Sequence, residues 1–303
     1  MNSPDLKQTV HFLVAVDGSE PSLAALRWVA QTASAGLRVQ CTVLAVQHPV
    51  MAGEVSALAA ASVTIEARAH EAAGILAQAS AVLRQAGLPH ATQTRVDDPA
   101  NAVIEQAQAL GCDAIVIGRR GHGVLRSALL GSVSAEVVRS ASVPVIVVGA
   151  VAAVPDTPQS PLRILVALDG SDCALRAADF AALLLSNADS RGQLHLLHVD
   201  STQTLAETIF GQRERVLAHW SAKHAQEALA GPRSHFERQG ISFTKHAVSS
   251  DDPGQAILQT ARDLDCTVVV MGTRGLGPVA GMLLGSVAQH VLAKAALAVA
   301  LVR

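Results

Sequence analysis

The sequence has few aromatic residues and no tyrosine. Aromatic side chains make up 2% of the 303 residues, whereas hydrophobic residues make up 50%. The interior must therefore be built from alanine, valine, leucine and isoleucine, which favours helices packed on sheets. Charged residues are also scarce, at 16%, and the formal net charge is −2. Because neither half carries the basic excess typical of nucleic-acid binding, we expect no nucleic-acid partner.

Metal-ligand and membrane signals are missing as well. The four cysteines form no CxxC pair, and no histidines or cysteines have zinc-site spacing, so we expect reduced thiols, no metal site and no catalytic thiol. The longest uncharged apolar run, residues 141–154, is too short to span a membrane and contains Pro144. No signal-peptide pattern is recognised. We therefore expect a soluble cytoplasmic protein with no membrane contact.

The second half of the sequence repeats the first. Residues 16–19, Val-Asp-Gly-Ser, recur 152 positions later as Leu-Asp-Gly-Ser. The Asp-Asp-Pro at 97–99 and the Leu-Leu-Gly-Ser at 129–132 both recur 154 positions later. Such self-similarity indicates a duplicated domain. We predict a first domain over residues 1–150, a second over 162–303, and a linker over 151–161, where prolines cluster.

Short β-branched runs alternate with longer Ala/Leu-rich segments of helical period in each half. In the first half we predict strands near 11–16, 39–46, 91–96, 113–118 and 144–148, and helices near 20–35, 54–86, 99–110 and 131–141. In the second half we predict strands near 162–168, 193–199, 241–248, 267–272 and 297–302, with helices between them. The alternation predicts an α/β fold in which each half forms a doubly wound, five-stranded parallel sheet with helices on both faces. Such sheets bind ligands beyond the carboxyl ends of their strands, where the winding direction reverses.

The most specific feature is a glycine pattern after the fourth predicted strand of each half. Gly118-x2-Gly121-x9-Gly131-Ser132 recurs with unchanged spacing as Gly272-x2-Gly275-x9-Gly285-Ser286. Glycines let a backbone turn sharply and approach phosphate oxygens, and Gly-Ser at a helix start adds free amides and a hydroxyl. The pattern predicts a polyphosphate cradle in each half. It is neither a Walker A loop nor a GxGxxG loop after the first strand, and simple turns with helix capping are the alternative.

Charged and polar residues accompany this pattern. Arg120 and Arg274 directly precede its second glycine, either as phosphate ligands or as solvated loop charges. The Asp-Pro pairs at 98–99 and 252–253 are typical of helix starts, with aspartate as N-cap. They still border the edge at which a ligand would bind.

An aspartate also ends the first strand of each half. Asp17 and Asp169 each precede Gly-Ser, at the point where a carboxylate can hold a ribose hydroxyl or hydrated Mg²⁺. Helix capping by the aspartate, or by Ser19 and Ser171, is the competing interpretation, and both roles can coexist.

Together these motifs resemble those of the universal stress protein family, in its ATP-binding subgroup. The resemblance rests on the glycine spacing, the strand-ending Asp-Gly-Ser and the Val-Pro-Val-Ile-Val-Val run at 143–148, and it extends over the whole chain, twice. It implies two Rossmann-like domains in which the nucleotide lies across the carboxyl edge of the sheet. The base then lies near the first two strands, with the phosphates on the glycine loop.

The resemblance implies a set of nucleotide contacts in each half. In the first half they are Ala15, Val16, Asp17, Val46, Ile117, Gly118, Arg120, Gly121, Gly131, Ser132, Val133 and Ser134. In the second half they are Ala167, Leu168, Asp169, Val199, Met271, Gly272, Arg274, Gly275, Gly285, Ser286, Val287 and Ala288. The implied cofactor is ATP, with ADP or AMP as alternatives, together with Mg²⁺. Because Ala288 stands where the first half has Ser134, we expect weaker binding in the second half.

The resemblance also implies partners. The two halves are expected to pair through their last strands, 143–148 and 297–302, about a pseudo-twofold axis, with a further homodimer left open. We expect a nucleotide-dependent regulator or sensor in the stress response, acting on an unidentified protein partner, and not an enzyme, although slow ATP hydrolysis is left open. One alternative is an adenine-nucleotide-dependent enzyme of related fold, whose HxGH or SGGxDS marker is missing here. Another is a nucleotide-free dimeric scaffold.

Overall fold

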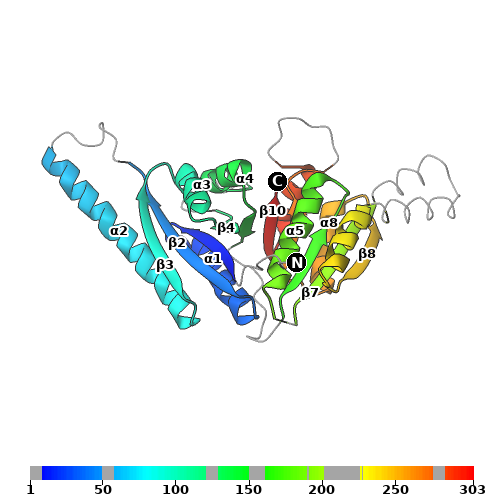
Figure 1. Cartoon of the computed structure of the whole chain (residues 1–303). Coiled ribbons are helices and arrows are strands. Elements are labelled where there is room, and N and C mark those ends of the chain that lie inside the picture. The colour runs from blue at the N-terminus through cyan, green and yellow to red at the C-terminus, as the bar shows by residue number, and fades with distance from the viewer. Residues whose placement is uncertain are drawn as a thin grey trace. The chain divides into compact units, whose positions relative to one another are not determined.

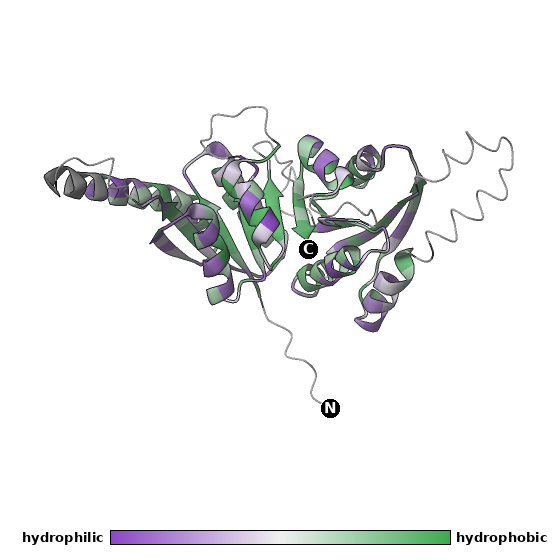
Figure 2. Ribbon diagram, turned by 90° about the horizontal axis from the view of Figure 1, so that it is seen from above, coloured by the Kyte–Doolittle hydropathy of each residue, from purple (hydrophilic) through white to green (hydrophobic). Residues whose placement is uncertain are grey.

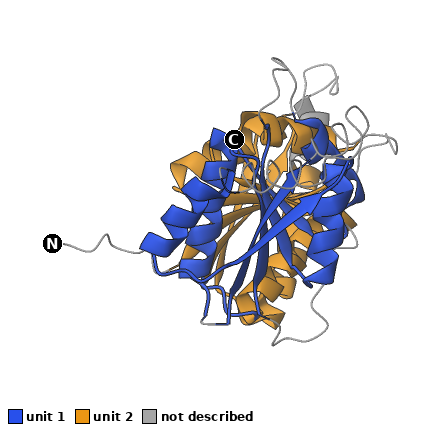
Figure 3. Cartoon of the chain, turned by 90° about the vertical axis from the view of Figure 1, so that its right-hand side faces the viewer, with its two compact units in different colours: residues 1–8, 35–38, 153–303 blue, residues 9–34, 39–152 orange. Residues whose placement is uncertain are grey.

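A computed structural model describes residues 9–49, 58–120, 129–149, 161–189, 191–200, 226, 228–275 and 284–303, without the side chains of 58–65. These residues divide into two compact units, which Figure 3 shows in different colours. One contains residues 9–34 and 39–149, and the other contains 35–38 and 161–303. In the described part of the chain, no helix combines the length and the hydropathy that crossing a membrane requires.

The first unit alternates strands and helices (Figure 1). Its strands are β1 (Val10–Val16), β2 (Val39–Gln47), β3 (His90–Val96), β4 (Ala114–Gly118) and β5 (Val145–Val148). Its helices are α1 (Glu20–Ser34), α2 (Leu58–Gln85), α3 (Pro99–Ala109) and α4 (Ser132–Ser140). The strands pair in parallel in the order β3-β2-β1-β4-β5. Because β1 lies between β2 and β4, the winding direction reverses beside β1, as the doubly wound prediction requires.

The second unit repeats this arrangement. Its strands are β6 (Arg163–Ala167), β7 (Gln193–Asp200), β8 (Thr244–Ser249), β9 (Val268–Gly272) and β10 (Ala298–Val302). Its labelled helices are α5 (Asp172–Ser186), α8 (Pro253–Asp263) and α9 (Ser286–Lys294), and residues 228–238 are also helical. The parallel strands follow the order β10-β9-β6-β7-β8, so β6 lies at the reversal point.

The strand predicted from residue 241 begins only at Thr244. The preceding residues instead close the helix over 228–238. Gly240 has a φ of +68°, and the Ile241 amide donates to the Phe236 carbonyl at 3.0 Å. A left-handed glycine followed by such a bond is a common helix C-terminal motif, and it uses the backbone donor that a strand would need. The prediction was therefore three residues too long at this end.

The cores are aliphatic, as the scarcity of aromatic residues predicts. Every residue of β4, β5 and β10 is buried, and the strands in Figure 2 are mostly hydrophobic. Strands β3 and β8 instead mix partly buried and exposed residues. For β4, which lies inside its sheet, full burial follows from helix packing on both faces of a parallel sheet. In the first unit α1 packs against β4 and β5, and α3 packs against α4.

Candidate functional site

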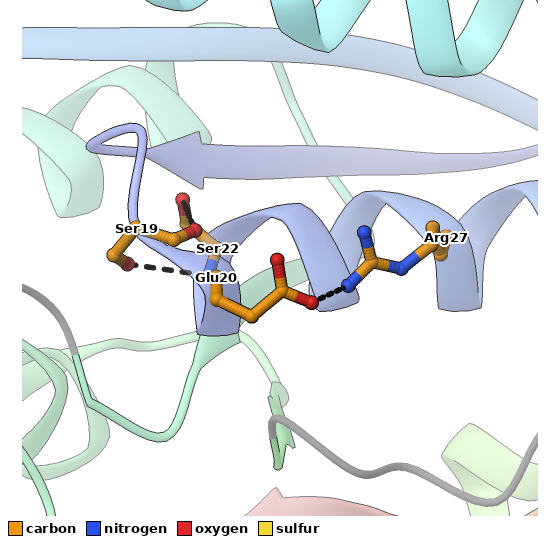
Figure 4. A network of polar contacts seen from close by, with 4 residues as sticks. All are labelled: Ser19, Glu20, Ser22 and Arg27. Atoms are coloured by element: carbon orange, nitrogen blue, oxygen red, sulfur yellow. Dashed lines mark hydrogen bonds and ion pairs between the residues drawn. The ribbon is translucent and has the colours of Figure 1, made fainter.

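The loop after β1 is organised by its own side chains. Oδ1 of Asp17 accepts the Ser19 amide at 3.0 Å and also accepts the Ser19 hydroxyl. Gly18, between them, has a φ of +80°, a conformation that favours glycine. The hydroxyl oxygen of Ser19 accepts a hydrogen bond from the Ser22 amide at 3.4 Å, where α1 begins. Figure 4 shows these serines beside the Glu20–Arg27 ion pair. Ser19 therefore occupies the cap, and Asp17 holds the loop.

The loop after β6 has the same design. Oδ1 of Asp169 accepts the Ser171 amide at 3.0 Å, and Gly170 has a φ of +85°. Ser171 is the N-cap of α5 and accepts the Ala174 amide at 3.2 Å. The sequence left open whether the aspartates or the serines cap these helices, and the structure shows Ser19 and Ser171 as the capping residues. Oδ2 of Asp169 extends towards Gly275, which follows β9.

The first glycine of each pattern is required by helix packing. A Cβ on Gly118 would lie 2.6 Å from the Pro21 carbonyl carbon and 2.8 Å from the Ser22 nitrogen. A Cβ on Gly272 would lie 2.8 Å from Cys173 Cβ in α5. Neither glycine has a positive φ, so the backbone conformation alone does not call for glycine at either position. The missing side chain lets the first turn of α1 or α5 approach the sheet closely.

In the second half, the second and third glycines of the pattern have different surroundings from the first glycine, Gly272. A Cβ on Gly275 would collide with Oδ2 of Asp169, so this glycine makes room for a carboxylate. A Cβ on Gly285 would meet its nearest neighbour, the Thr273 carbonyl oxygen, at 3.6 Å, which is an ordinary contact. Gly285 also has a φ of −63°, which any residue adopts. A side chain at 275 would therefore displace the Asp169 carboxylate, whereas a Cβ at 285 would fit in ordinary van der Waals contact.

Helices α4 and α9 begin at the third glycine. Gly131 and Gly285 are their N-caps, with no side-chain cap, and Ser132 and Ser286 are the first helical residues. The cap amides are anchored, because Gly131 donates to the Arg119 carbonyl at 3.0 Å and Gly285 donates to the Thr273 carbonyl at 2.8 Å. The following amides begin a helix and have no partner within it. They lie at the positive end of the helix dipole, where an anion is stabilised.

The first turn of α4 is tied to the end of β4. The buried hydroxyl of Ser134 donates to the Gly118 carbonyl oxygen at 2.9 Å. Its donor is therefore engaged within the fold, although the sequence comparison of Ser134 with Ala288 treated it as a ligand group. The lower affinity expected for the second half stays a prediction.

A cavity of about 420 Å³ lies at the carboxyl ends of the strands in the second unit. All twelve contacts that the resemblance implies for this half line it: Ala167, Leu168, Asp169, Val199, Met271, Gly272, Arg274, Gly275, Gly285, Ser286, Val287 and Ala288. The volume is within the range of small-molecule sites.

Four further residues line the cavity: Leu197, Pro253, Ile257 and Thr273. Strand alternation could have indicated Leu197, which is two residues before Val199. Ile257 lies one helical turn after Pro253 in α8, so its position depended on how that helix packs. Asp98 and Asp252 cap α3 and α8 by accepting the amides of Asn101 and Gln255, which confirms the predicted helix starts.

The first unit places its predicted residues on the equivalent elements. Ala15 and Val16 end β1, Val46 lies near the end of β2, and Ile117 and Gly118 end β4. Asp17 follows β1 and is exposed, as is Arg120 after β4. Gly131, Ser132, Val133 and Ser134 form the start of α4. Gly121 lies outside the described residues. Because β1 lies between β2 and β4, these strand ends meet at one edge of the sheet.

Two groups near these sites have notable electrostatics. Burial, reinforced by the charge of Arg120, lowers the pKa of the Arg119 guanidinium. In β7, Nδ1 of the buried His198 lies 2.9 Å from the Leu168 carbonyl, so that nitrogen carries a proton and donates it. Leu168 directly follows β6, so this contact ties β7 to the loop after the neighbouring strand.

Comparison with known proteins gives consistent matches. The model of the universal stress protein family matches residues 10–149 and again 162–303. A universal stress protein of Mycolicibacterium smegmatis is 32% identical over 302 residues, which covers 96% of each chain. One from Thermus aquaticus is 35% identical over 143 residues, 46% of this chain and 97% of its own. The crystal structure of a universal stress protein from Archaeoglobus fulgidus, 24% identical, superposes with a TM-score of 0.67 over 97% of this chain and 98% of its own.

Proposed function

We propose that this chain, which belongs to the universal stress protein family, binds an adenine nucleotide in each half and acts as a nucleotide-dependent regulator in the stress response. One observation carries the binding proposal. The twelve residues that the family resemblance implied for the second half surround a single cavity at the carboxyl edge of the sheet. They come from β6, β7 and β9, the loops after β6 and β9, and the start of α9.

The cavity wall has the chemistry of a nucleotide site. Leu168, Leu197, Val199, Ile257 and Met271 provide apolar surface for a base. The amides at the start of α9 suit phosphate oxygens, and the missing side chain at Gly285, which also lines the cavity, lets such a group approach the backbone. These features support ATP over an uncharged ligand.

Mg²⁺ fits the same proposal through one carboxylate. Oδ1 of Asp169 is occupied by the Ser171 amide, whereas Oδ2 lies at the cavity beside Gly275. A single protein carboxylate suits Mg²⁺, which keeps several waters and is otherwise held by nucleotide phosphates. A ribose hydroxyl is the alternative occupant of this position.

The proposal is one of binding without efficient turnover. Among the described residues that line the cavity, Asp169 is the sole carboxylate, and no histidine joins it. Rapid phosphoryl transfer requires a positioned base and a metal held by further ligands. Slow hydrolysis is compatible with the proposal and would fall when Asp17 and Asp169 are replaced by asparagine.

Isothermal titration calorimetry with ATP, with mass spectrometry of the nucleotide that co-purifies, tests the proposal. We expect two equivalents of nucleotide bound per chain. Gly285→Leu and Gly131→Leu should each remove one equivalent, because the side chain enters the space beside the helix start, and the double variant should remove both. Circular dichroism of each variant controls for folding. Absence of ATP, ADP and AMP binding by the intact chain would contradict the proposal.

Pairing of the halves through residues 143–148 and 297–302, a further homodimer, and a protein partner that responds to bound nucleotide belong to the same proposal. Light scattering with and without ATP measures the homodimer. Cross-linking between single cysteines introduced into the two terminal strands measures the pairing.

A further inference from the structure

We infer that Arg119 makes the first-half site select nucleotides with more phosphates, whereas the second-half site, with Thr273 at the same position, discriminates less. The inference rests on the proposed function, because it concerns the ligand of the same sites. It adds a difference in ligand preference between two sites that share one glycine pattern.

Arg119 and Thr273 occupy the same place in the backbone. The Arg119 amide donates to the Val148 carbonyl, and the Thr273 amide donates to the Val302 carbonyl, both at 2.8 Å. Their carbonyl oxygens accept the N-cap amides of α4 and α9, from Gly131 and Gly285. Each residue is therefore held between the last strand and the start of the following helix. The two side chains leave the backbone at equivalent points.

That point faces the candidate site. Thr273 is 3% exposed and lines the cavity, two residues after Met271 on the same side of the strand. The intervening Gly272 faces the other side, against Cys173 of α5. In the first unit Gly118 likewise faces α1. Because successive residues of an extended chain point to opposite faces, Arg119 leaves on the face that corresponds to the cavity.

The first unit therefore carries an additional cation at this position. Arg119 is partly buried and Arg120 follows it, whereas in the second half a threonine precedes the single Arg274. Burial, together with the neighbouring Arg120, lowers the pKa of the Arg119 guanidinium. An anion beside both guanidinium groups offsets the repulsion between them and forms charge-assisted hydrogen bonds.

The benefit grows with ligand charge, because each phosphate beyond the first adds negative charge near the glycine loop. The ratio of AMP to ATP dissociation constants should therefore be larger in the first half than in the second. One charged hydrogen bond corresponds to roughly a tenfold change in affinity. We expect Arg119→Thr to lower the first-half ratio by about that factor, and Thr273→Arg to raise the second-half ratio similarly.

Methyl NMR of the full chain resolves the two sites. Ile117 and Met271 occupy equivalent positions just before the first glycine and are both buried, so their ¹³C-labelled methyl groups report on the first and second half. ATP, ADP and AMP are titrated separately into the wild-type chain, Arg119→Thr, Thr273→Arg and Arg119→Lys. Arg84→Gln, which removes an exposed cation at the end of α2, controls for net charge.

The outcomes separate this inference from the proposed function. The inference is supported if Arg119→Thr lowers the first-half ratio of AMP to ATP dissociation constants while Arg119→Lys and Arg84→Gln keep the wild-type ratio. A higher second-half ratio in Thr273→Arg supports it as well. An unchanged ratio, or equal weakening of ATP and AMP in Arg119→Thr, overturns the inference while leaving nucleotide binding intact. If neither methyl group responds to any nucleotide in the wild-type chain, the proposed function itself has failed.

Discussion

The carboxylate of Asp169 lies against the backbone of Gly275, so the loop after β6 meets the loop after β9 at the wall of the cavity. Oδ2 of Asp169 takes the space that a side chain at 275 would fill. The second glycine of the pattern and the strand-ending aspartate therefore depend on each other. Through this contact, two motifs far apart in the sequence form one site.

Gly275→Ala should displace the Asp169 carboxylate and weaken nucleotide binding. Because the displaced atom is the end of a rotatable side chain, the free energy of unfolding should change by less than about 1 kcal/mol. Calorimetry with ATP, with and without Mg²⁺, measures the loss at the second site. Asp169→Asn/Gly275→Ala should then bind no more weakly than Asp169→Asn alone. An additive further loss would show that the two residues act separately.

Gly118→Ala should destabilise the first unit strongly. Its Cβ would meet backbone atoms of Pro21 and Ser22, which cannot rotate away, so we expect a loss of about 1–3 kcal/mol or more in the free energy of unfolding. Gly74→Ala in α2 is the matched control, because a Cβ there meets nothing within 4 Å. It should stabilise the helix by about 0.5–1 kcal/mol. Hydrogen exchange of peptides from residues 9–149 measures both effects.

Ser134→Ala should reduce stability more than it reduces nucleotide affinity. It removes the donor of a buried hydrogen bond to the Gly118 carbonyl, which contributes about 1 kcal/mol. Ala288→Ser introduces a hydroxyl at the equivalent position of α9 and should be neutral or stabilising. Chemical denaturation and ATP titration of both variants test this. A tenfold loss of ATP affinity at unchanged stability would instead assign the Ser134 hydroxyl to the ligand.

Cysteine labelling of the native protein should be selective. Cys41, Cys112 and Cys266 are buried, and Cys173 is partly accessible. Burial raises the pKa of Cys41 and of Cys266 to about 12, so neither forms the reactive thiolate near neutral pH. We expect iodoacetamide to label Cys173 first and the other three only after unfolding, as peptide mass spectrometry would show. Rapid labelling of Cys41 in the native state would contradict the described packing.

Acidification should destabilise the second unit through a pair of histidines. Nδ1 of His195 lies 3.2 Å from Nε2 of His246 on the adjacent strand. Burial lowers the pKa of both, and the charges of His246 and Arg163 lower that of His195 further. The folded state therefore binds fewer protons than the unfolded state as pH falls below the ordinary value of 6.5. The contribution of the two neutral histidines to the free energy of unfolding is complete above that pH, and it is lost as pH falls through their lowered pKa values.

Hydrogen exchange of peptides from β7 and β8 at a series of pH values between about 5 and 8 measures this loss. His246→Gln should flatten the dependence, because it removes one of the two titrating rings. His70→Gln, at an exposed position of α2, should leave it unchanged. A steeper dependence in His246→Gln would show that protonation of the pair is favourable in the folded state.

The sequence by itself determined the fold class, the duplication and the sheet edge that carries the candidate site. Alternating apolar patterns are local, and each strand contains its own signal, which is why most predicted bounds agree with β1 to β10 to within a residue. The glycine spacing, repeated 154 positions apart, marked Gly272, Gly275 and Gly285, which line one cavity in the second unit together with the other contacts that the family resemblance implied. Parallel strands bring their carboxyl ends to one edge, so residues at strand ends could be grouped without coordinates.

Only the tertiary structure decided what each of these residues does there. Gly118 is glycine because α1 crosses close above it, Gly275 because Asp169 reaches over it, and Gly285 for neither reason. Ile257 reaches the cavity, and Ser134 turns its hydroxyl to the Gly118 carbonyl, through the placement of α8 and α4 on the sheet. The sequence shows only that each of these positions is glycine. The physical reason for glycine lies in atoms from distant segments, which packing alone brings together.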